Sequence, residues 1–472
     1  METLRPSPPA RRWLRLPAAG AAGAVVGLAA AAVLLLGPAS GAVGDPPVPP
    51  ALDPARIIDA THVPPVLTLP GEPLTLRYDV YCPPPADSSR DECDAAGTVY
   101  VRAGDAGPFS ALPLNLDRRA GEGRWAARVP PDIARSDDGV SYYAVLRNRT
   151  AGTEVTLPAG GAAAPQRAYA AAGMIPVELG GHAFGRTRAA TARVFSAVWG
   201  DGPADAGLEG GRETEPVGPG SFVVGADGAV TVLDQVHHRA LVQAAGAPAV
   251  HDVPLDINGT LADLAGGGSG PLWVLETAGA DAPMLKEFRR DGSAQGEVPL
   301  GTRTAAQLRI GPAGPIVKEY PSEQWVPAVE DGAALGLRAQ RRGAEPLRAV
   351  SASRQVAVVR AGDEVRVAIV GPGGVERAWR VLSTTPLAEV QLAEPYADGV
   401  LLVVRTYTDT RAEFEVVQLG ARGPVASFAL ASDDWAETMP LSRFRLSGSS
   451  LYQLGSTPSG VHVDRFDLEV AS

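Results

Sequence analysis

The chain has 472 residues, of which 45% are hydrophobic and 20% are charged, and its net charge is −11. This length exceeds what one hydrophobic core organises, so about two or three domains are expected, and the composition excludes a chain that is disordered throughout. Only Lys286 and Lys318 are lysines, and this acidic balance excludes a nucleic-acid-binding surface, because phosphate neutralisation needs clustered basic residues. The 54 glycines and 43 prolines lie among short Val- and Leu-rich runs, which predicts an all-β fold with many turns.

The first 42 residues have the features of a bacterial export signal. An uncharged apolar run over 18–36 is followed by small residues as far as Ala42, and it is preceded by the basic residues Arg5, Arg11, Arg12 and Arg15. The run is close to the length of about 20 residues that spans a bilayer. Residues 1–42 are therefore predicted to be a signal peptide cut after Ala42 or a transmembrane anchor helix, and both place the rest of the chain outside the cytoplasm. A Pro-rich linker over 43–54 follows.

Two cysteines, Cys82 and Cys93, follow the export segment. Outside the cytoplasm oxidising conditions allow a disulfide, and a bridge here would close the polar, Pro-led loop 83–92, stabilising the fold by about 3 kcal/mol in the loop-entropy model. A zinc site needs more ligands, and no histidine lies near either cysteine. We therefore predict a disulfide across a surface loop and no metal site.

Residues 55–165 predict a small β-sandwich. Apolar and polar residues alternate over 73–81 and again over 98–102, which is the pattern of half-buried strands. About seven short strands in roughly 110 residues is typical of a sandwich. The remaining strand candidates in this region are 110–116, 124–129 and 140–147.

The segment 138–145, Asp-Gly-Val-Ser-Tyr-Tyr-Ala-Val, resembles the turn and tyrosine that open strand F in immunoglobulin and fibronectin type III domains. The resemblance implies that the hydroxyl of Tyr142 or Tyr143 ties a corner to the backbone. No cysteine follows these tyrosines, and the two cysteines are too close in sequence to bridge two sheets, so an antibody-type domain is excluded. Trp125 and both tyrosines are expected to pack in the core and corner rather than to form a ligand platform.

Residues 166–472, which follow a Gly- and Ala-rich linker over 159–165, repeat a pattern of strand, tight turn and strand. Corresponding strands lie roughly 40 to 50 residues apart, which is the length of a four-stranded propeller blade. Because a closed ring removes exposed sheet edges, we predict a β-propeller of about six blades, closed by a C-terminal strand over 461–470. Two stacked β-sandwiches are the alternative. The repeating units are 220–243, 271–288, 307–329, 355–370, 399–419 and 450–468.

The first of these units, 226–239, resembles the NHL repeat, in which a strand is followed by Asp, a short turn with Asn, and Arg. Asp234 and Arg239 match this pattern, and His237 stands where Asn is usual. The resemblance is confined to this unit. It implies an NHL-like propeller and no particular activity.

No catalytic motif is present: the chain has no Gly-x-Ser-x-Gly elbow, phosphate loop or nucleotide fingerprint, and its six histidines form no metal-binding pair. Two clusters are candidates for binding. One is the Gly-rich segment 180–188, and the other is the basic turn before Arg239. Structural roles, in an interdomain linker and in a hairpin with an Asp234–Arg239 ion pair, are the alternatives. The candidate residues are His182, Arg186, Arg188, His237 and His238.

An acidic stretch contains Asp252, Asp256, Asn258 and Asp263 and resembles part of a calcium-binding loop. It lacks further oxygen ligands in register and a terminal Glu. A solvated turn between blades is therefore expected there, and neither a metal nor another cofactor is predicted.

Two recognition folds without a catalytic motif predict an exported surface protein with a non-catalytic binding or scaffolding role. The propeller rim or axial channel is expected to bind a protein or carbohydrate ligand of unknown identity, with no nucleic acid and with membrane contact only through the N-terminal segment. The alternative is a lyase or hydrolase with a metal in the central channel, as in the lyases built on such repeats. A sensor domain held at the membrane by the N-terminal helix is a third hypothesis.

Overall fold

The computed structural model describes the chain between residues 58 and 469, with internal gaps. The predicted export segment, 1–42, and linker, 43–54, lie outside the described residues. Within the described part, no helix is long and apolar enough to cross a membrane. The described residues are 58–82, 94–117, 123–210, 215–258, 261–266, 270–277, 283–300, 305–311, 314–319, 325–330, 333–334, 348–351, 354–361, 363–436 and 442–469.

The N-terminal unit is one bent sheet of nine strands. β5 pairs with β4 along most of its length and with β6 at its end, so the sheet turns a corner there and its two halves form facing layers. A single helical turn, α1 (Pro131–Ala134), joins β6 to β7. The strands are β1 (Asp59–Thr61), β2 (Leu67–Thr68), β3 (Thr75–Tyr81), β4 (Ala95–Ala103), β5 (Ser110–Leu116), β6 (Arg124–Arg128), β7 (Val140–Asn148), β8 (Thr153–Leu157) and β9 (Gln166–Ala170).

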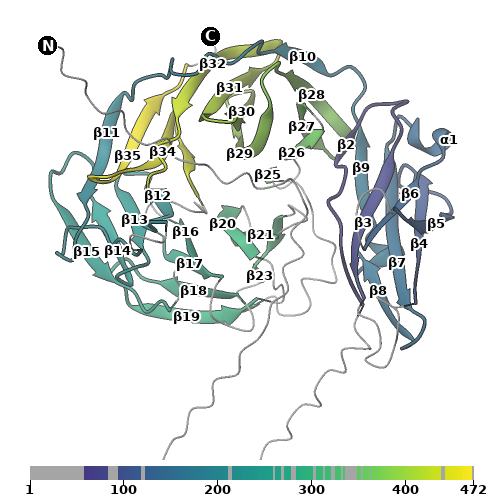
Figure 1. Ribbon diagram of the computed structural model, residues 1–472, viewed down its shortest axis with the longest axis horizontal. Coiled ribbons are helices and arrows are strands. Elements are labelled where there is room, and N and C mark those ends of the chain that lie inside the picture. The colour runs from purple at the N-terminus through teal and green to yellow at the C-terminus, as the bar shows by residue number, and fades with distance from the viewer. Residues whose placement is uncertain are drawn as a thin grey trace, which may run out of the picture.

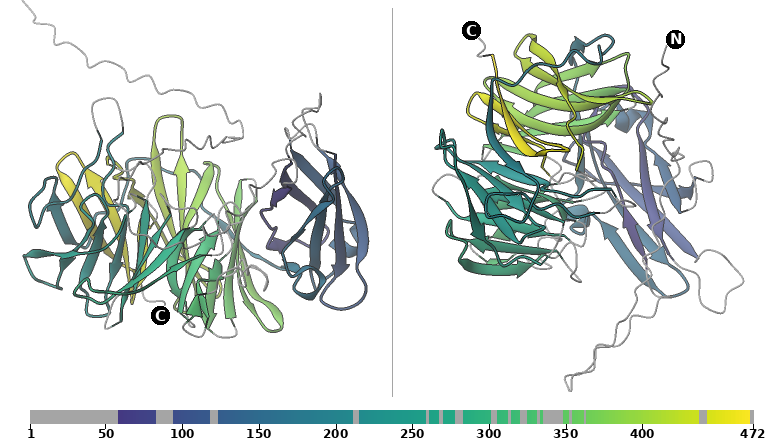
Figure 2. Two further views of the ribbon diagram at one scale, coloured as in Figure 1. Left: turned by 90° about the horizontal axis from the view of Figure 1, so that it is seen from below. Right: turned by 60° about the vertical axis from the view of Figure 1, so that its left-hand side comes forward.

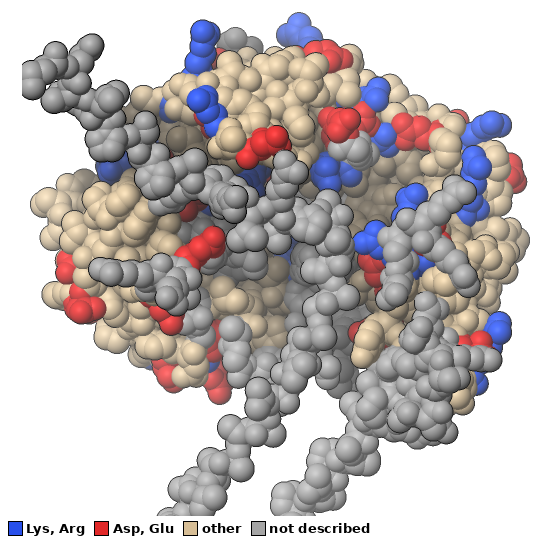
Figure 3. Space-filling model, in the orientation of Figure 1, with Lys and Arg blue, Asp and Glu red and all other residues tan. Residues whose placement is uncertain are grey.

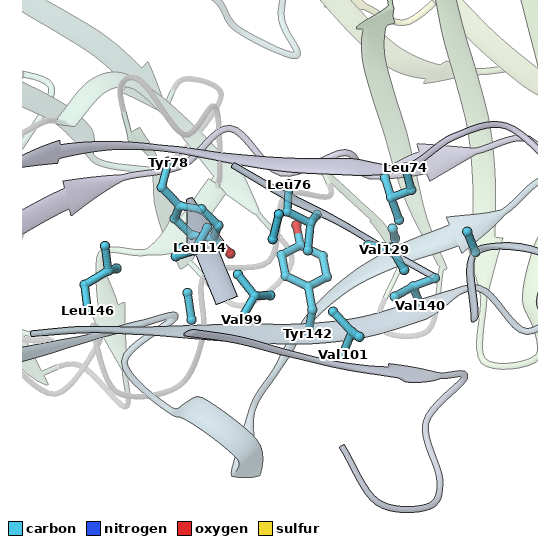
Figure 4. Close-up of a cluster of buried hydrophobic side chains, with 14 of the residues drawn as sticks. Leu74, Leu76, Tyr78, Val99, Val101, Leu114, Val129, Val140, Tyr142 and Leu146 are labelled. Atoms are coloured by element: carbon cyan, nitrogen blue, oxygen red, sulfur yellow. The ribbon is translucent and has the colours of Figure 1, made fainter. Parts of the chain in front are cut away.

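One hydrophobic core fills the space between the two layers (Figure 4). Alternate residues of a strand point to the same face, so Leu76 and Tyr78 of β3 both project inward. They meet Val99 from β4 and Tyr142 from β7, and all four side chains are buried. The strands predicted from alternation over 73–81 and 98–102 are therefore present, and their apolar residues form the core.

The predicted corner and loop differ in detail from the structure. The hydroxyl of Tyr142 contacts Nε2 of His62 at 2.8 Å, so its partner is a side chain and not the backbone. Tyr143 lies outside the core and stacks on Tyr100. Trp125 packs half-buried against the core, as expected. Cys82 follows β3, whereas Cys93 lies outside the described residues, so the Cys82–Cys93 bridge stays a prediction.

The N-terminal sheet extends beyond the boundary predicted at residue 165. β9 follows that point and pairs with β7 and β2, so it completes the first unit. The predicted linker, 159–165, contains the short helical turn η2 (Gly161–Ala163), which packs near Tyr143. The segment is thus an ordered connection between β8 and β9, because both strands belong to the same sheet.

Residues 175–469 form a β-propeller in which six sheets follow one another around a ring (Figure 1). Blade 1 contains β12–β15, blade 2 contains β16–β19, and blade 3 contains β20–β22. The hairpin β23–β24 lies between blades 3 and 4 in sequence. The strands are β12 (Ser221–Val224), β13 (Val230–Asp234), β14 (Arg239–Gln243), β15 (Val250–Pro254), β16 (Ala262–Gly266), β17 (Leu272–Glu276), β18 (Met284–Phe288), β19 (Ala294–Pro299), β20 (Ala305–Gly311), β21 (Gly314–Glu319), β22 (Trp325–Pro327), β23 (Val329–Glu330) and β24 (Ala333–Ala334).

Blades 4 to 6 are built from longer strands. Each of them is a meander of antiparallel strands, and blades 4 and 6 each gain one strand from the segment before β12. The strands are β25 (Arg348–Ser351), β26 (Arg354–Ala361), β27 (Glu364–Gly371), β28 (Gly374–Leu382), β29 (Leu387–Tyr396), β30 (Gly399–Tyr407), β31 (Ala412–Gly420), β32 (Gly423–Ala431), β33 (Phe444–Ser447), β34 (Ser450–Thr457) and β35 (Gly460–Asp467). The predicted propeller of about six blades is confirmed, and the alternative of two stacked sandwiches is wrong.

A segment that we call the strap, residues 175–198, runs along the outer edges of blades 4, 5 and 6 (Figure 1). Its first strand, β10 (Ile175–Glu178), pairs parallel with β28. The amide of Arg188 then donates to the carbonyl of Ala429 in β32 at 2.8 Å. Its last strand, β11 (Ala192–Val198), pairs antiparallel with β35. The C-terminal strand, β35, therefore closes the ring, as predicted, by pairing with β11 from the N-terminal part of the propeller.

The N-terminal unit, which we call the sandwich for its two facing layers, docks on the edge of the ring at blade 4 (Figure 2). Leu67 of β2 and Ala171, just after β9, pack in one buried cluster with Ala368 and Val370 of β27. Beside this cluster the guanidinium of Arg366 makes an ion pair with Glu72 at 2.8 Å. The two units are thus held together by both apolar burial and a charge pair.

Candidate functional site

One face of the propeller carries most of the polar groups that sequence analysis selected. The turns that join the second and third strands of a blade all lie on the same face of a ring built from meanders. In blades 1, 5 and 6 these turns are residues 235–238, 408–411 and 458–459. We call this the turn face. The described parts of the links from each blade to the next, such as 432–436, lie on it as well.

A groove of about 700 Å³ opens on the turn face of blade 5, beside the link that leads to blade 6. Its walls come from the end of β30, the β30–β31 turn and the link after β32, with Ala388 of the inner strand β29 at one side. The aromatic ring of Tyr407 is 44% exposed here. The lining residues are Ala388, Arg405, Tyr407, Thr408, Asp409, Thr410, Arg411, Ala412, Glu413, Ser432 and Asp434.

Two guanidinium groups in this groove are available to a ligand. Arg405 and Arg411 are exposed, and neither side chain forms an ion pair with any residue in the described ranges. The carboxylate of Glu413, in contrast, is occupied on both oxygens: Nε2 of His182 lies 2.8 Å from one, and the amide of Gly185 donates to the other at 2.8 Å. Glu413 therefore binds the strap, and the two guanidinium groups are left without an ion-pair partner among the described residues.

The β30–β31 turn that carries Arg411 is closed by hydrogen bonds. The amide of Thr408 donates to the carbonyl of Arg411 at 2.8 Å, and Oγ1 of Thr408 accepts from the amide of Arg411 at 3.2 Å. These bonds fix the turn, so that Asp409 and Thr410 at its tip project away from the strands.

A smaller cavity of about 190 Å³ lies beneath the strap, between blades 4 and 5. Its lining includes His182 and Arg186 from the strap, Glu415 from β31 and Thr406 from β30. The structure thus brings two of the predicted binding residues together. Arg186 is exposed at the edge of this cavity.

His182 fastens the strap to blade 5. Nδ1 lies 2.8 Å from Glu415 and Nε2 lies 2.8 Å from Glu413, and the imidazole is only 5% exposed. Burial raises the pKa of Glu415 above its ordinary value, against the opposing effect of the hydrogen bond from His182. His182 therefore holds together two carboxylates that would otherwise repel each other.

The axial channel is bounded by the inner strands of the blades, and a cavity of about 140 Å³ lies in it. Asp263 of β16 is fully buried there and organises several blades: it accepts hydrogen bonds from Oγ of Ser442 at 3.0 Å and from the amide of Leu308 at 2.6 Å. Arg309 and Arg445 approach the same carboxylate at 3.6 and 3.5 Å.

The described part of the channel does not fit a metal ion. A divalent cation needs carboxylate, imidazole or carbonyl donors. Here the charged lining consists of Glu394 and two guanidinium groups, Arg309 and Arg445, which are donors and would repel a cation. No cluster of metal-ligating side chains is found among the described residues.

The remaining predicted binding residues have structural partners. Arg188 stacks over Phe428 at 4.5 Å and donates to the carbonyl of Asp467 at 2.8 Å, which ties the strap to blades 5 and 6. His238 is exposed in the β13–β14 turn, where it adopts a φ of 54°. Its backbone contributes to the fold, because its carbonyl accepts a hydrogen bond from the amide of Leu255 at 2.9 Å.

His237 belongs to a buried ion cluster. Its Nδ1 and the Nε of Arg239 both lie 2.9 Å from the same oxygen of Asp234. Arg239 also donates to the carbonyl of Asp205 at 2.6 Å, so the cluster anchors the long link 199–220 to blade 1. The expected Asp234–Arg239 ion pair is present, and it joins the second and third strands of the blade.

The residues that resemble a calcium loop do not act together. Asp252 pairs with Arg239 at 3.6 Å, and Asp256 uses its carbonyl to accept from Lys286 at 2.8 Å. Asp263 is buried in the channel, which corrects the expectation of a solvated turn. These acidic residues are close in sequence, but their partners lie in different parts of the fold.

Sequence analysis missed Arg405, Tyr407, Arg411 and Asp434, which line the groove. The available signal was the polar and aromatic run Arg-Thr-Tyr-Thr-Asp-Thr-Arg over 405–411, between two long apolar strands. Such turns are common on any sheet protein, so the run becomes a candidate only when the fold places it at a cavity.

No protein family model and no curated protein sequence matches this chain. Solved structures that resemble it include a glucose dehydrogenase, with 12% identity and a TM-score of 0.35 over 60% of this chain and 99% of that one. A catalytically inactive virginiamycin B lyase from Staphylococcus aureus has 10% identity and a TM-score of 0.32 over 55% and 99%. YCF48 bound to D1 peptide has 14% identity and a TM-score of 0.29 over 54% and 80%. Scores this low carry no argument about function, and the propeller rests on its own strand pairing.

Proposed function

We propose that this chain is a non-catalytic binding protein that takes its ligand in the groove on the turn face of blade 5. One observation carries the proposal: the groove has the volume of a ligand site and presents an exposed aromatic ring beside two guanidinium groups that have no ion-pair partner among the described residues. Ligand sites commonly combine such an aromatic surface with a few polar groups that fix orientation. The rim of the propeller, and not its channel, is therefore the recognition surface.

The channel is the less favoured site. It is smaller, and its charged groups already bind one another around Asp263. The lyase or hydrolase alternative requires a metal in that channel, and the guanidinium groups of Arg309 and Arg445 do not suit one.

The compartment and domain relationships are part of the same proposal. Export is supported by the basic and apolar N-terminal sequence, with Ala42 as the cleavage site or with the run 18–36 as an anchor. An immunoglobulin- or fibronectin-like origin of the N-terminal unit is supported by its two facing layers and its buried Tyr142. An NHL-like first blade is supported by the Asp234–Arg239 ion pair.

A binding screen with paired variants tests the site. Purified protein is applied to arrays of glycans and peptides, together with Tyr407→Ala and with Arg422→Ala as a matched control. Arg422 lies in the β31–β32 turn, on the opposite face of the same blade. Ligands that bind the wild type and Arg422→Ala but not Tyr407→Ala support the groove. Ligands that bind all three proteins equally contradict it.

A further inference from the structure

We infer that the groove recognises an anionic carbohydrate, that is, a polyhydroxylated chain bearing carboxylate or sulfate groups. This inference rests on the proposed function and adds the chemistry of the ligand. It follows from which polar groups in the groove already have partners and which remain open.

The open positive charges select an anion. A guanidinium presents several N–H donors in a planar fork that matches carboxylate and sulfate oxygens. Arg405 near the end of β30 and Arg411 in the β30–β31 turn both line the groove, within one hairpin. Two such groups suit a ligand with repeated negative charges better than one with a single charge.

The acidic residues of the groove select hydroxyl groups. Asp434 accepts a hydrogen bond from Oγ of Ser432 at 3.2 Å on one oxygen, and Asp409 at the turn tip is exposed. Carboxylates are acceptors only, so they bind groups that donate. An acidic sugar chain carries hydroxyls that can donate to Asp409 and Asp434 beside its charged groups, whereas the side chains of an acidic peptide only accept. The mixture therefore favours a carbohydrate over an acidic peptide.

The exposed ring of Tyr407 supplies an apolar surface between these polar groups. The C–H face of a sugar ring packs on an aromatic ring while its hydroxyls reach polar neighbours. Figure 3 shows that acidic and basic side chains are interspersed on the face it displays, and the chain as a whole carries a net charge of −11. Affinity for an anion must then come from local contacts, because the long-range field opposes it.

The test measures binding of four polymers by calorimetry at low and moderate salt: polygalacturonate, heparin, neutral dextran and polyglutamate. The proteins are the wild type, Arg405→Ala, Arg411→Ala, Tyr407→Ala and the control Arg422→Ala. We expect polygalacturonate or heparin to bind, each groove arginine variant to lose about tenfold in affinity, and the control to be unchanged. Binding should also weaken as salt rises.

The outcomes separate the inference from the proposed function. Preference for polygalacturonate identifies a carboxylated sugar, and preference for heparin a sulfated one. Dextran binding that Tyr407→Ala abolishes and the arginine variants retain would overturn the anionic inference while the groove remains the site. Stronger binding of polyglutamate would assign the groove to acidic peptides and overturn the carbohydrate. Binding that no groove variant changes, or no binding of any polymer, would overturn both.

Discussion

The sandwich and the propeller each enclose a histidine, and the partners of the two imidazoles differ. In the sandwich His62 stacks on Tyr78 and contacts two neutral groups, the carbonyl of Arg77 at 2.6 Å and the hydroxyl of Tyr142 at 2.8 Å. In the propeller His182 lies between the carboxylates of Glu413 and Glu415. One histidine thus packs among neutral groups within a core, whereas the other, held between two carboxylates, joins the strap to blade 5.

This difference follows from how each unit is built. The sandwich encloses one core within a continuous sheet, so its polar groups are satisfied locally. The propeller contains several smaller cores between blades, and a separate segment, the strap, must join blades 4, 5 and 6. The cost of losing single contacts should therefore be distributed differently in the two units.

The largest effect is expected where the strap closes the ring. Phe195 of β11 is buried against blades 6 and 1, and Phe195→Ala should destabilise the protein by about 3–5 kcal/mol through the cavity it leaves. Val198→Ala, on the same strand but 59% exposed, should change stability little. Urea unfolding measures both. Equal stability of the two variants would show that the ring does not depend on β11.

The next effect is a pH dependence in the sandwich. Burial lowers the pKa of His62 from 6.5 to about 4, so the folded state resists protonation. The contribution of neutral His62 to the free energy of unfolding is fully present above pH 6.5 and is lost as pH falls toward 4. Because the residue is partly exposed, we expect this loss to be about 2–3 kcal/mol. Urea unfolding at pH 7.5 and pH 4 should show it, and His62→Gln should reduce it. Carbon chemical shifts of His62 that titrate near pH 6.5 would contradict the lowered pKa.

A smaller effect is expected at the fastening of the strap. His182→Ala leaves two carboxylates side by side and should cost about 2 kcal/mol at pH 7.5. In Glu415→Gln the amide can donate to Nδ1 while Nε2–H donates to Glu413, so the contacts persist. This variant should be at least as stable as the wild type at pH 7.5.

The pH dependence at this site has a definite sign. The pKa of Glu415 is raised, so its contribution to stability is present below its ordinary value of 4.5 and is lost as pH rises through the raised value. Glu415→Gln should remove this dependence. If Glu415→Gln lowered the free energy of unfolding as much as His182→Ala does, this would contradict the account in which the contacts of His182 persist in Glu415→Gln.

The smallest effects are opposite in sign for two tyrosines of one core. The hydroxyl of Tyr78 is buried without a hydrogen-bond partner among the described residues, so Tyr78→Phe should stabilise by about 1 kcal/mol. Tyr142→Phe removes the partner of His62 and should destabilise by about 1 kcal/mol. Thermal unfolding of both variants decides the matter, and the same sign for both would contradict the assigned hydrogen bonding.

Sequence predicted the parts of the fold that depend on neighbours in the chain. Alternation and turn residues indicate the hairpins; for example, Asp227-Gly228 is a pair typical of hairpin turns, and Gly228 has a φ of 78° at the turn between β12 and β13. The strap was not predicted, because β10 and β11 pair with strands that follow more than 200 residues later. Its short runs of alternation carry no information on their partners.

The same reason explains the candidate site. His182 was selected for its unusual Gly-rich surroundings, but its partners Glu413 and Glu415 are distant in sequence, so its structural role was not visible. Arg405 and Tyr407 at the end of β30 and Arg411 in the following turn form an ordinary polar run, and only the pairing of the strands of blade 5 places this run near Asp434 in the link after β32. Local pattern identifies elements, whereas the groove depends on how the strands of the blade and this link are arranged.

Hydrogen exchange with and without polygalacturonate or heparin, whichever binds more tightly, tests the central claim that the groove on the turn face of blade 5 is the binding site. The account predicts slower exchange for amides of the β30–β31 turn, 408–411, and of the link at 432–434, with no change in the sandwich. Protection of the sandwich or of the inner strands around Asp263, with the β30–β31 turn unchanged, would contradict it.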